Sequence, residues 1–242
     1  MDSAIKEAIE SSTEEMKKLL TFSAELLERH RSDVFAEPTS GYLRLVAAAA
    51  LMRIPDALRG IMVLCANGLP LEANTVSRTL LELAIVALWI GLDERRARQI
   101  WNRSRSDWHN GLGRASEHLD HPPVVKEHME AMKPAPGDAL RPNLKACADQ
   151  AIDVPELKAR QYARYLYNVL YDPLSAAAHG DLRFAKVIAN EDQLPLIPSA
   201  LSHAVSVTIY LLAVVSAQLG FQDEYAQFLV ISGLHAPEGD AT

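Results

Sequence analysis

Two charged side chains stand four residues apart in a stretch that is otherwise almost entirely apolar. Residues 78–90 contain Arg78 and Glu82, and almost all the others are Leu, Ala, Ile, Val or Trp. Four residues make about one helical turn, so both side chains lie on one helix face. Burial of such charges is costly unless they are paired and hydrogen-bonded. The pair predicts either a clamp between packed helices or the floor of a site, with Arg78 anchoring an anion and Glu82 acting as base or orienting partner.

A second polar pair stands about ninety residues later. Ser175 and His179 are also four apart, and His179 directly precedes Gly180, where we expect a helix to end. The negative end of a helix favours the charged imidazole, which suits a general acid or base. The alternative is a buried histidine bonded to a carboxylate such as Glu82. The candidate ligand contacts in this segment are Tyr171, Ser175 and Asp181.

A third candidate is the basic segment 101–110, which carries a tryptophan near each end, Trp101 and Trp108. Basic side chains interleaved with aromatic rings can contact phosphates and stack bases. In that interpretation Arg105 and His109 are candidate ligand contacts. The alternative is an ordinary amphipathic helix without a ligand.

A histidine-rich stretch raises the question of a metal. Residues 117–121 and His128 contain potential ligands, but the order of residues does not form HExxH and no CxxC pair occurs. We interpret this cluster as solvated, and we expect neither a metal nor a cofactor. The two cysteines, Cys65 and Cys147, are isolated from each other in apolar surroundings and predict buried, reduced thiols.

The composition limits the classes of partner. The chain has 242 residues, 49% of them apolar, and a formal net charge of −7. An acidic chain does not suit general binding of duplex DNA or of an anionic membrane, so we expect neither partner. The first residues do not resemble a signal peptide, and we expect a cytoplasmic protein. The apolar stretch 204–219 is interpreted as a central core helix.

Helical periodicity runs through the chain, and strand-like alternation is rare. The fold class expected is all-α, a multi-helix bundle of about eight to ten helices with a proline-interrupted excursion around 113–153. We expect one domain over 1–236, with an amphipathic helix in 1–36 and a disordered tail at 237–242. The other predicted helices cover about 41–53, 55–66 starting at Pro55, 71–92, 94–119, 155–171, 173–180, 199–219 and 222–234.

The order and spacing of the two polar pairs resemble a known family. An Arg-x3-Glu helix followed by a Ser-x3-His segment is similar to a bacterial all-helical domain of unknown function, the 5677 group, over about residues 42–219. The resemblance implies an all-helical protein in which Arg78, Glu82 and His179 are drawn together. It implies no settled activity.

A more distant similarity is to HEPN helical domains, many of which are ribonucleases or toxins. Their signature is an Arg followed by a His four to six residues on. Arg103 and His109 fit that spacing, whereas Pro173 and Leu174 stand where an Arg would precede His179. The similarity implies cleavage of RNA without a metal, by a dimer.

Three functions follow from these patterns. The first is a helical bundle whose buried cluster of Arg78, Glu82, Ser175 and His179 binds a small anionic or nucleotide-like ligand, with His179 as proton donor or acceptor. The second is a HEPN-like ribonuclease or toxin component that acts on an RNA fragment as a homodimer. The third is a non-catalytic interaction module. The sequence leaves open whether the chain is an enzyme.

Overall fold

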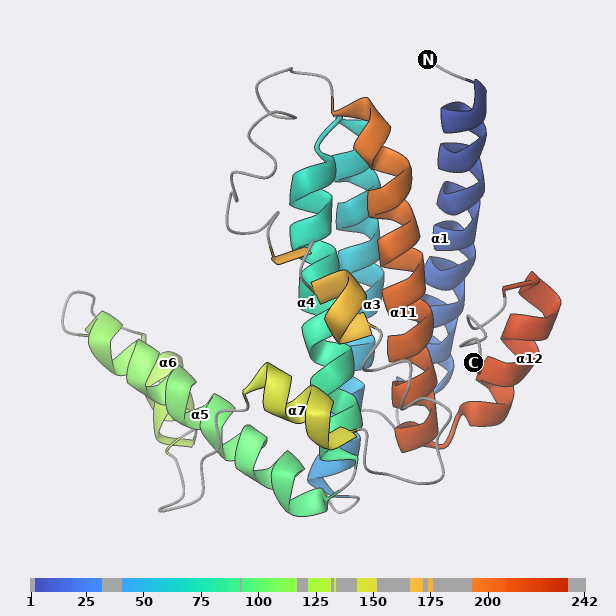
Figure 1. Cartoon of the computed structure of the whole chain (residues 1–242). Coiled ribbons are helices and arrows are strands. Elements are labelled where there is room, and N and C mark those ends of the chain that lie inside the picture. Colours follow the sequence, from blue (N-terminus) through green and yellow to red (C-terminus); the bar gives the residue numbers. More distant parts are fainter. Residues whose placement is uncertain are drawn as a thin grey trace.

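The computed structural model describes residues 3–31, 41–91, 93–116, 122–131, 133, 143–151, 166–171, 174–175 and 193–234. Within these residues the chain forms eight α-helices and no strand. The helices pack as a bundle (Figure 1), which confirms the all-α prediction. The predicted tail at 237–242 and the predicted helix starts at 155 and 173 lie outside the described residues.

Four long helices lie side by side in the body of the molecule (Figure 1). They are α1 (Ser3–Arg29), α3 (Tyr42–Ala66), α4 (Pro70–Ile90) and α11 (Ile197–Leu219). The most extensive contact joins α4 to α11, and α3 packs against both. Helices so distant in sequence come together because each carries apolar side chains that must be buried.

Small residues let these helices approach closely. Ala47, Ala48 and Ala50 of α3 are buried, as the alanine-rich sequence predicts. Two stretches, Pro70–Ile90 and Leu194–Leu219, are long and apolar enough to cross a membrane. Most of each apolar stretch is buried against neighbouring helices, so both also fit the core of a bundle. The predicted core helix within 204–219 is confirmed as part of α11.

The predicted helix start at Pro55 is wrong. Helix α3 runs without a break from Tyr42 to Ala66, and Pro55 lies inside it. A proline in a helix interior removes one backbone hydrogen bond and costs about 3 kcal/mol or more. The helix tolerates this because side chains on both sides of the proline, among them Leu51 and Leu58, are fully buried in the same core. The predicted stop after α3 is confirmed: Gly68 has φ +72°, and α4 begins at Pro70.

Two helices form an arm that projects from the bundle (Figure 1). Helix α5 (Glu94–Ser116) continues through Gly111 and Gly113, and α6 (Pro123–Ala131) folds back on it. Helix α7 (Leu144–Ala151) instead packs on α4. There the Trp89 indole donates a hydrogen bond to Gln150 Oε1 at 2.8 Å. The described part of the expected excursion around 113–153 therefore forms two separate pieces. Helix α6 belongs to the arm, and α7 packs on α4.

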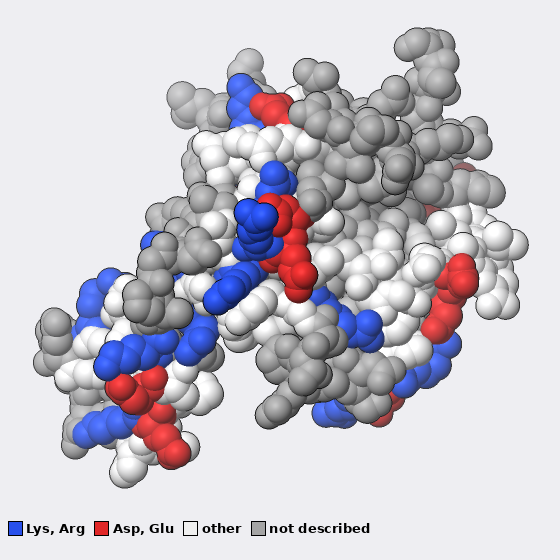
Figure 2. All heavy atoms as spheres, turned by 90° about the horizontal axis from the view of Figure 1, so that it is seen from below, with Lys and Arg blue, Asp and Glu red and all other residues white. Residues whose placement is uncertain are grey.

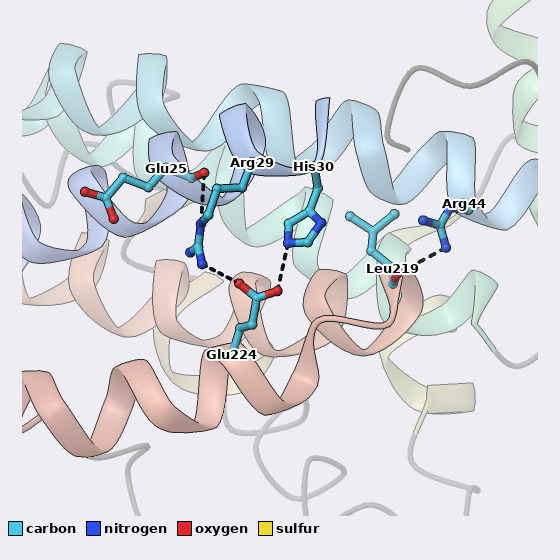
Figure 3. A network of polar contacts seen from close by, with 6 residues as sticks. All are labelled: Glu25, Arg29, His30, Arg44, Leu219 and Glu224. Atoms are coloured by element: carbon cyan, nitrogen blue, oxygen red, sulfur yellow. Dashed lines mark hydrogen bonds and ion pairs between the residues drawn. The ribbon is translucent and has the colours of Figure 1, made fainter. Parts of the chain in front are cut away.

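Helix α12 (Gln222–Ser232) is fixed to the first helix by one acidic side chain (Figure 3). One oxygen of Glu224 lies 2.7 Å from Arg29 Nη1, and the other lies 2.7 Å from His30 Nε2. The imidazole of His30 also stacks on Phe221, with ring centroids 3.9 Å apart. Nearby, Arg44 donates to the backbone oxygen of Leu219 at 3.1 Å. These contacts hold the ends of α1 and α11 and the start of α12 together.

Both cysteines are free and buried. Burial raises the pKa of Cys65 to about 11. Burial also raises the pKa of Cys147 to about 11, although the charge of Arg96 acts in the opposite direction. Since the thiolate is the reactive form of cysteine, both thiols are poor nucleophiles near neutral pH. The prediction is confirmed in two respects: both thiols are buried, and neither forms a disulfide.

Candidate functional site

Arg78 and Glu82 form the ion pair that their spacing predicts. Arg78 Nε donates a hydrogen bond to Glu82 Oε1 at 2.9 Å, within one turn of α4. The expectation that the pair is buried is wrong, because the side chain of Arg78 is 18% exposed and that of Glu82 is 40% exposed. Helix α4 is covered by other helices on most sides, but its polar face lies at the edge of the bundle. The pair is therefore partly exposed to solvent, more at Glu82 than at Arg78.

A tyrosine from a distant segment joins the pair. Tyr171 ends the π-helix η2 (Leu166–Tyr171), which contacts α4. Arg78 Nη2 donates to the Tyr171 hydroxyl oxygen at 3.2 Å, and the guanidinium carbon lies 5.2 Å from the centre of the Tyr171 ring. The guanidinium is thus held by a carboxylate, a phenol oxygen and an aromatic ring. Short π-helical segments occur often at functional sites.

A second tyrosine extends this aromatic surface. The rings of Tyr167 and Tyr171 stack with centroids 4.9 Å apart and planes 15° apart, and both side chains are partly exposed. Tyr167 was not among the site residues predicted from the sequence. Its spacing of four residues from Tyr171 was a usable signal, because residues i and i+4 are neighbours on a helix.

The structure tests only part of the predicted Ser-x3-His segment. Ser175 is helical and partly exposed. His179 and Asp181 lie outside the described residues, so their convergence with Arg78 and Glu82 stays a prediction. Of the candidate residues, the structure brings together Arg78, Glu82 and Tyr171.

One turn before Arg78, a further polar contact joins α4 to α11. The nearly buried Asn74 Oδ1 lies 3.4 Å from His203 Nδ1, and Ser199 Oγ lies 3.4 Å from His203 Nε2. Burial lowers the pKa of His203 below its ordinary range, which favours the neutral imidazole. Asn74 precedes Arg78 by four residues, as Arg78 precedes Glu82, and this repeat was a signal in the sequence.

Arg105 and His109 lie in a different part of the molecule. Arg105 Nη2 donates to the backbone oxygens of Ala131 and Lys133, the latter at 3.1 Å. His109 Nδ1 lies 3.0 Å from the Met129 backbone oxygen. Side chains of this kind commonly bind the unpaired carbonyls at a helix C-terminus. Both residues therefore join α5 to the end of α6, and their predicted role as ligand contacts is untested.

The other residues of the basic segment also make contacts within the arm. Arg103 pairs with Asp107, with Nη2 and Oδ1 2.7 Å apart. The Trp108 ring meets the edge of the His128 ring, with centroids 5.5 Å apart. Among the described residues no group of three His, Cys, Asp or Glu side chains could hold a metal ion. His118 and His121 lie outside them.

One comparison with known proteins gives a match. A family of unknown function (DUF5677) matches residues 44–194, which include α3, α4, the arm, α7 and η2. No curated protein and no solved structure matches the chain.

Proposed function

This chain belongs to a family of unknown function (DUF5677), and we propose that the Arg78 face of α4 binds a small anionic, nucleotide-like ligand. One observation carries the proposal. The Arg78 side chain is 18% exposed, and its guanidinium contacts Glu82 and Tyr171, whose ring stacks on Tyr167. The three chemical features of this surface are a cation, a carboxylate and an aromatic platform.

The cation supports recognition of an anion. Arginine presents a planar set of N–H donors that matches phosphate and carboxylate oxygens. Its long side chain loses conformational freedom when it binds a ligand, and part of this entropy is already lost in the contacts with Glu82 and Tyr171. Arg78 is thus oriented before a ligand arrives.

The carboxylate narrows the chemistry of the ligand. Glu82 offsets much of the positive charge of Arg78, so a bare anion gains little at this surface. A ligand that carries both an anionic group and hydroxyl or amino donors satisfies both side chains. Because the side chain of Glu82 is 40% exposed, it can accept such a hydrogen bond without a large rearrangement.

The stacked tyrosines favour a ligand with a planar ring. Stacking of a base on an aromatic side chain contributes about 1–3 kcal/mol and tolerates any base. A phosphate, ribose hydroxyls and a base together match the cation, the carboxylate and the rings. In this proposal His179, four residues after Ser175, exchanges a proton with the ligand, as the sequence predicts.

The test is titration calorimetry of the full chain with adenosine monophosphate, ribose 5-phosphate and inorganic phosphate. We expect adenosine monophosphate to bind most tightly. Arg78→Lys should weaken its binding about tenfold or more, because Lys keeps the charge but loses the planar donor set. Arg59→Lys is a matched control, since Arg59 also forms an ion pair within a helix, with Asp56, and should leave binding unchanged.

Two outcomes would refute the proposal. One is that none of the three probes binds at millimolar concentration. The other is equal affinity in the wild type and in a folded Arg78→Ala variant. If Arg78→Ala alters only thermal melting, the non-catalytic interaction module becomes the better account.

A further inference from the structure

The charge of this chain is distributed unevenly. The whole chain has a net charge of −7, yet α5 carries six arginines, no lysine and only two acidic residues. The arginines are Arg95, Arg96, Arg98, Arg103, Arg105 and Arg114. Figure 2 shows Lys and Arg side chains along the arm, with Asp and Glu side chains beside them both near the bundle and on the outer part of the arm. A basic helix thus stands out against an acidic protein.

Helix α5 is not a core helix. Of the described side chains of α5, only those of Ala97 and Asn102 are buried, and α6 buries none. The arm projects from the bundle (Figure 1), so much of the surface of α5 faces solvent.

Contacts within the protein leave most of the positive charge in place. Arg96 and Arg105 bond to backbone oxygens, which are neutral and cancel no charge. Arg103 is compensated by Asp107. Arg95, Arg98 and Arg114 are exposed, and the Arg98 guanidinium carbon lies 5.9 Å from the centre of the Tyr42 ring, which is neutral. The field around α5 is therefore positive, and a positive field attracts polyanions.

One large aromatic side chain is exposed within this basic helix. Trp108 is 48% exposed, although exposure of so large an apolar ring has a cost in water. The ring of His128 from α6 lies nearly perpendicular to it, at 78°, with ring centroids 5.5 Å apart. An accessible indole among arginines matches the combination that stacks unpaired bases while cations contact the phosphates.

We propose that the solvent-exposed sides of α5 bind single-stranded nucleic acid, which is flexible enough to follow arginines that lie on different sides of the helix. Arg95, Arg98 and Arg114 contact phosphates over roughly 30 Å of helix, and Trp108 stacks on a base. Arginine, the only cation in α5, binds phosphate oxygens through two donors at once. An exposed ring for stacking favours a single strand over a duplex, whose bases are already stacked. This proposal is independent of ligand binding at Arg78.

The test is fluorescence anisotropy of the full chain with a labelled 12-nucleotide oligouridine at 50 mM salt. We expect the triple variant Arg95→Gln/Arg98→Gln/Arg114→Gln to bind at least about tenfold more weakly. The slope of log affinity against log salt should become shallower by about 2, at roughly 0.7 for each phosphate contact on a single strand. The control Lys6→Gln/Lys17→Gln/Arg59→Gln removes three exposed cations from other helices and should change affinity less than about twofold.

A second variant tests the stacking. Trp108→Ala should weaken binding about fivefold or more and leave the salt slope unchanged, since it removes a ring and no charge. Val124→Ala, an exposed apolar residue of α6, should have no effect.

Several outcomes would overturn the proposal. The first is that the wild type does not bind oligouridine, and the second is that the triple variant and its control lose affinity equally. The third is that duplex RNA binds more tightly than oligouridine, and the fourth is that polyglutamate binds as tightly as oligouridine. Self-association that disappears in the triple variant would identify an acidic face of a second copy as the partner instead.

Discussion

The bundle and the arm are built from different amino acids. In the bundle, α1, α3, α4 and α11 supply nearly all the fully buried side chains. In the arm, α5 and α6 bury two described side chains between them and carry a concentration of arginine. The comparison indicates that the bundle holds most of the stability of the protein, whereas the arm is shaped by charge. Substitutions can test this division.

The largest effect should come from the core. Leu81→Ala in α4 removes a side chain with 0% exposure and should lower the free energy of unfolding by about 2–5 kcal/mol. In the arm, Val124→Ala removes a side chain that is 69% exposed and should change it by less than about 0.5 kcal/mol. Urea unfolding followed by circular dichroism measures both. Equal losses would mean that the arm is part of the same packed core.

Glycines inside helices of the bundle and of the arm allow the same substitution to be compared in both regions. A Cβ at Gly60 in α3 or at Gly113 in α5 would meet nothing within 4 Å, so alanine fits both sites. Gly60→Ala should stabilise the whole protein by about 0.5–1 kcal/mol. We expect Gly113→Ala to raise hydrogen-exchange protection only in the arm, because Gly113 lies near the outer end of α5, in the part that projects from the bundle (Figure 1).

Gly91 is the control, because an added Cβ at this position would meet a neighbouring side chain. At Gly91 a Cβ would lie 2.8 Å from Gln218 Nε2, which donates to the Ala87 oxygen. Gly91→Ala should therefore destabilise the protein. A rise in global stability on Gly113→Ala that equals the rise on Gly60→Ala would contradict the separation of arm and bundle.

The ion pair at the edge of the bundle should contribute little to stability. Glu82→Ala should lower the free energy of unfolding by about 1 kcal/mol, because solvent reaches Glu82 and weakens its pair with the less exposed Arg78. Asp56→Ala, which breaks the exposed pair with Arg59, should have a similar effect. Thermal melting compares the two. A loss of about 3–5 kcal/mol in Glu82→Ala alone would identify a buried structural clamp.

The smallest effect at neutral pH should come from His203. Its pKa is lowered by burial, so the unfolded chain binds a proton more readily than the folded protein. Stability should be unaffected by this group above pH about 6.5 and should fall as the pH drops below that value. His203→Gln should make the melting temperature less dependent on pH between about 6.5 and 5. An unchanged dependence would show that other groups cause the acid sensitivity.

Much of the fold could be predicted because it follows from local pattern. Apolar periodicity gave the long helices, and Gly68 with Pro70 marked a true boundary. Pro55 gave a false boundary, because proline disfavours a helix locally whereas core burial on both sides of it favours one. Local pattern carries no information about burial by residues that are distant in sequence.

The candidate site shows the same limit. The spacing of Arg78 and Glu82 predicted their contact, but their exposure depends on where α3, α7 and α11 pack around α4. Asn74 and His203 were missed as partners because 129 residues separate them. Contacts within one helical turn can be inferred from sequence, whereas contacts between helices require the tertiary structure.

The pairing of α4 with α11 has a consequence for synthesis of the chain. The two helices share the most extensive contact in the molecule, yet about 100 residues separate the end of one from the start of the other. At roughly 5–20 residues per second, α4 leaves the ribosome about 5–20 s before its main partner exists. During that interval one of the most apolar helices of the protein has no α11 to cover it. The apolar surface of α4 that α11 covers in the finished protein is therefore exposed in the nascent chain.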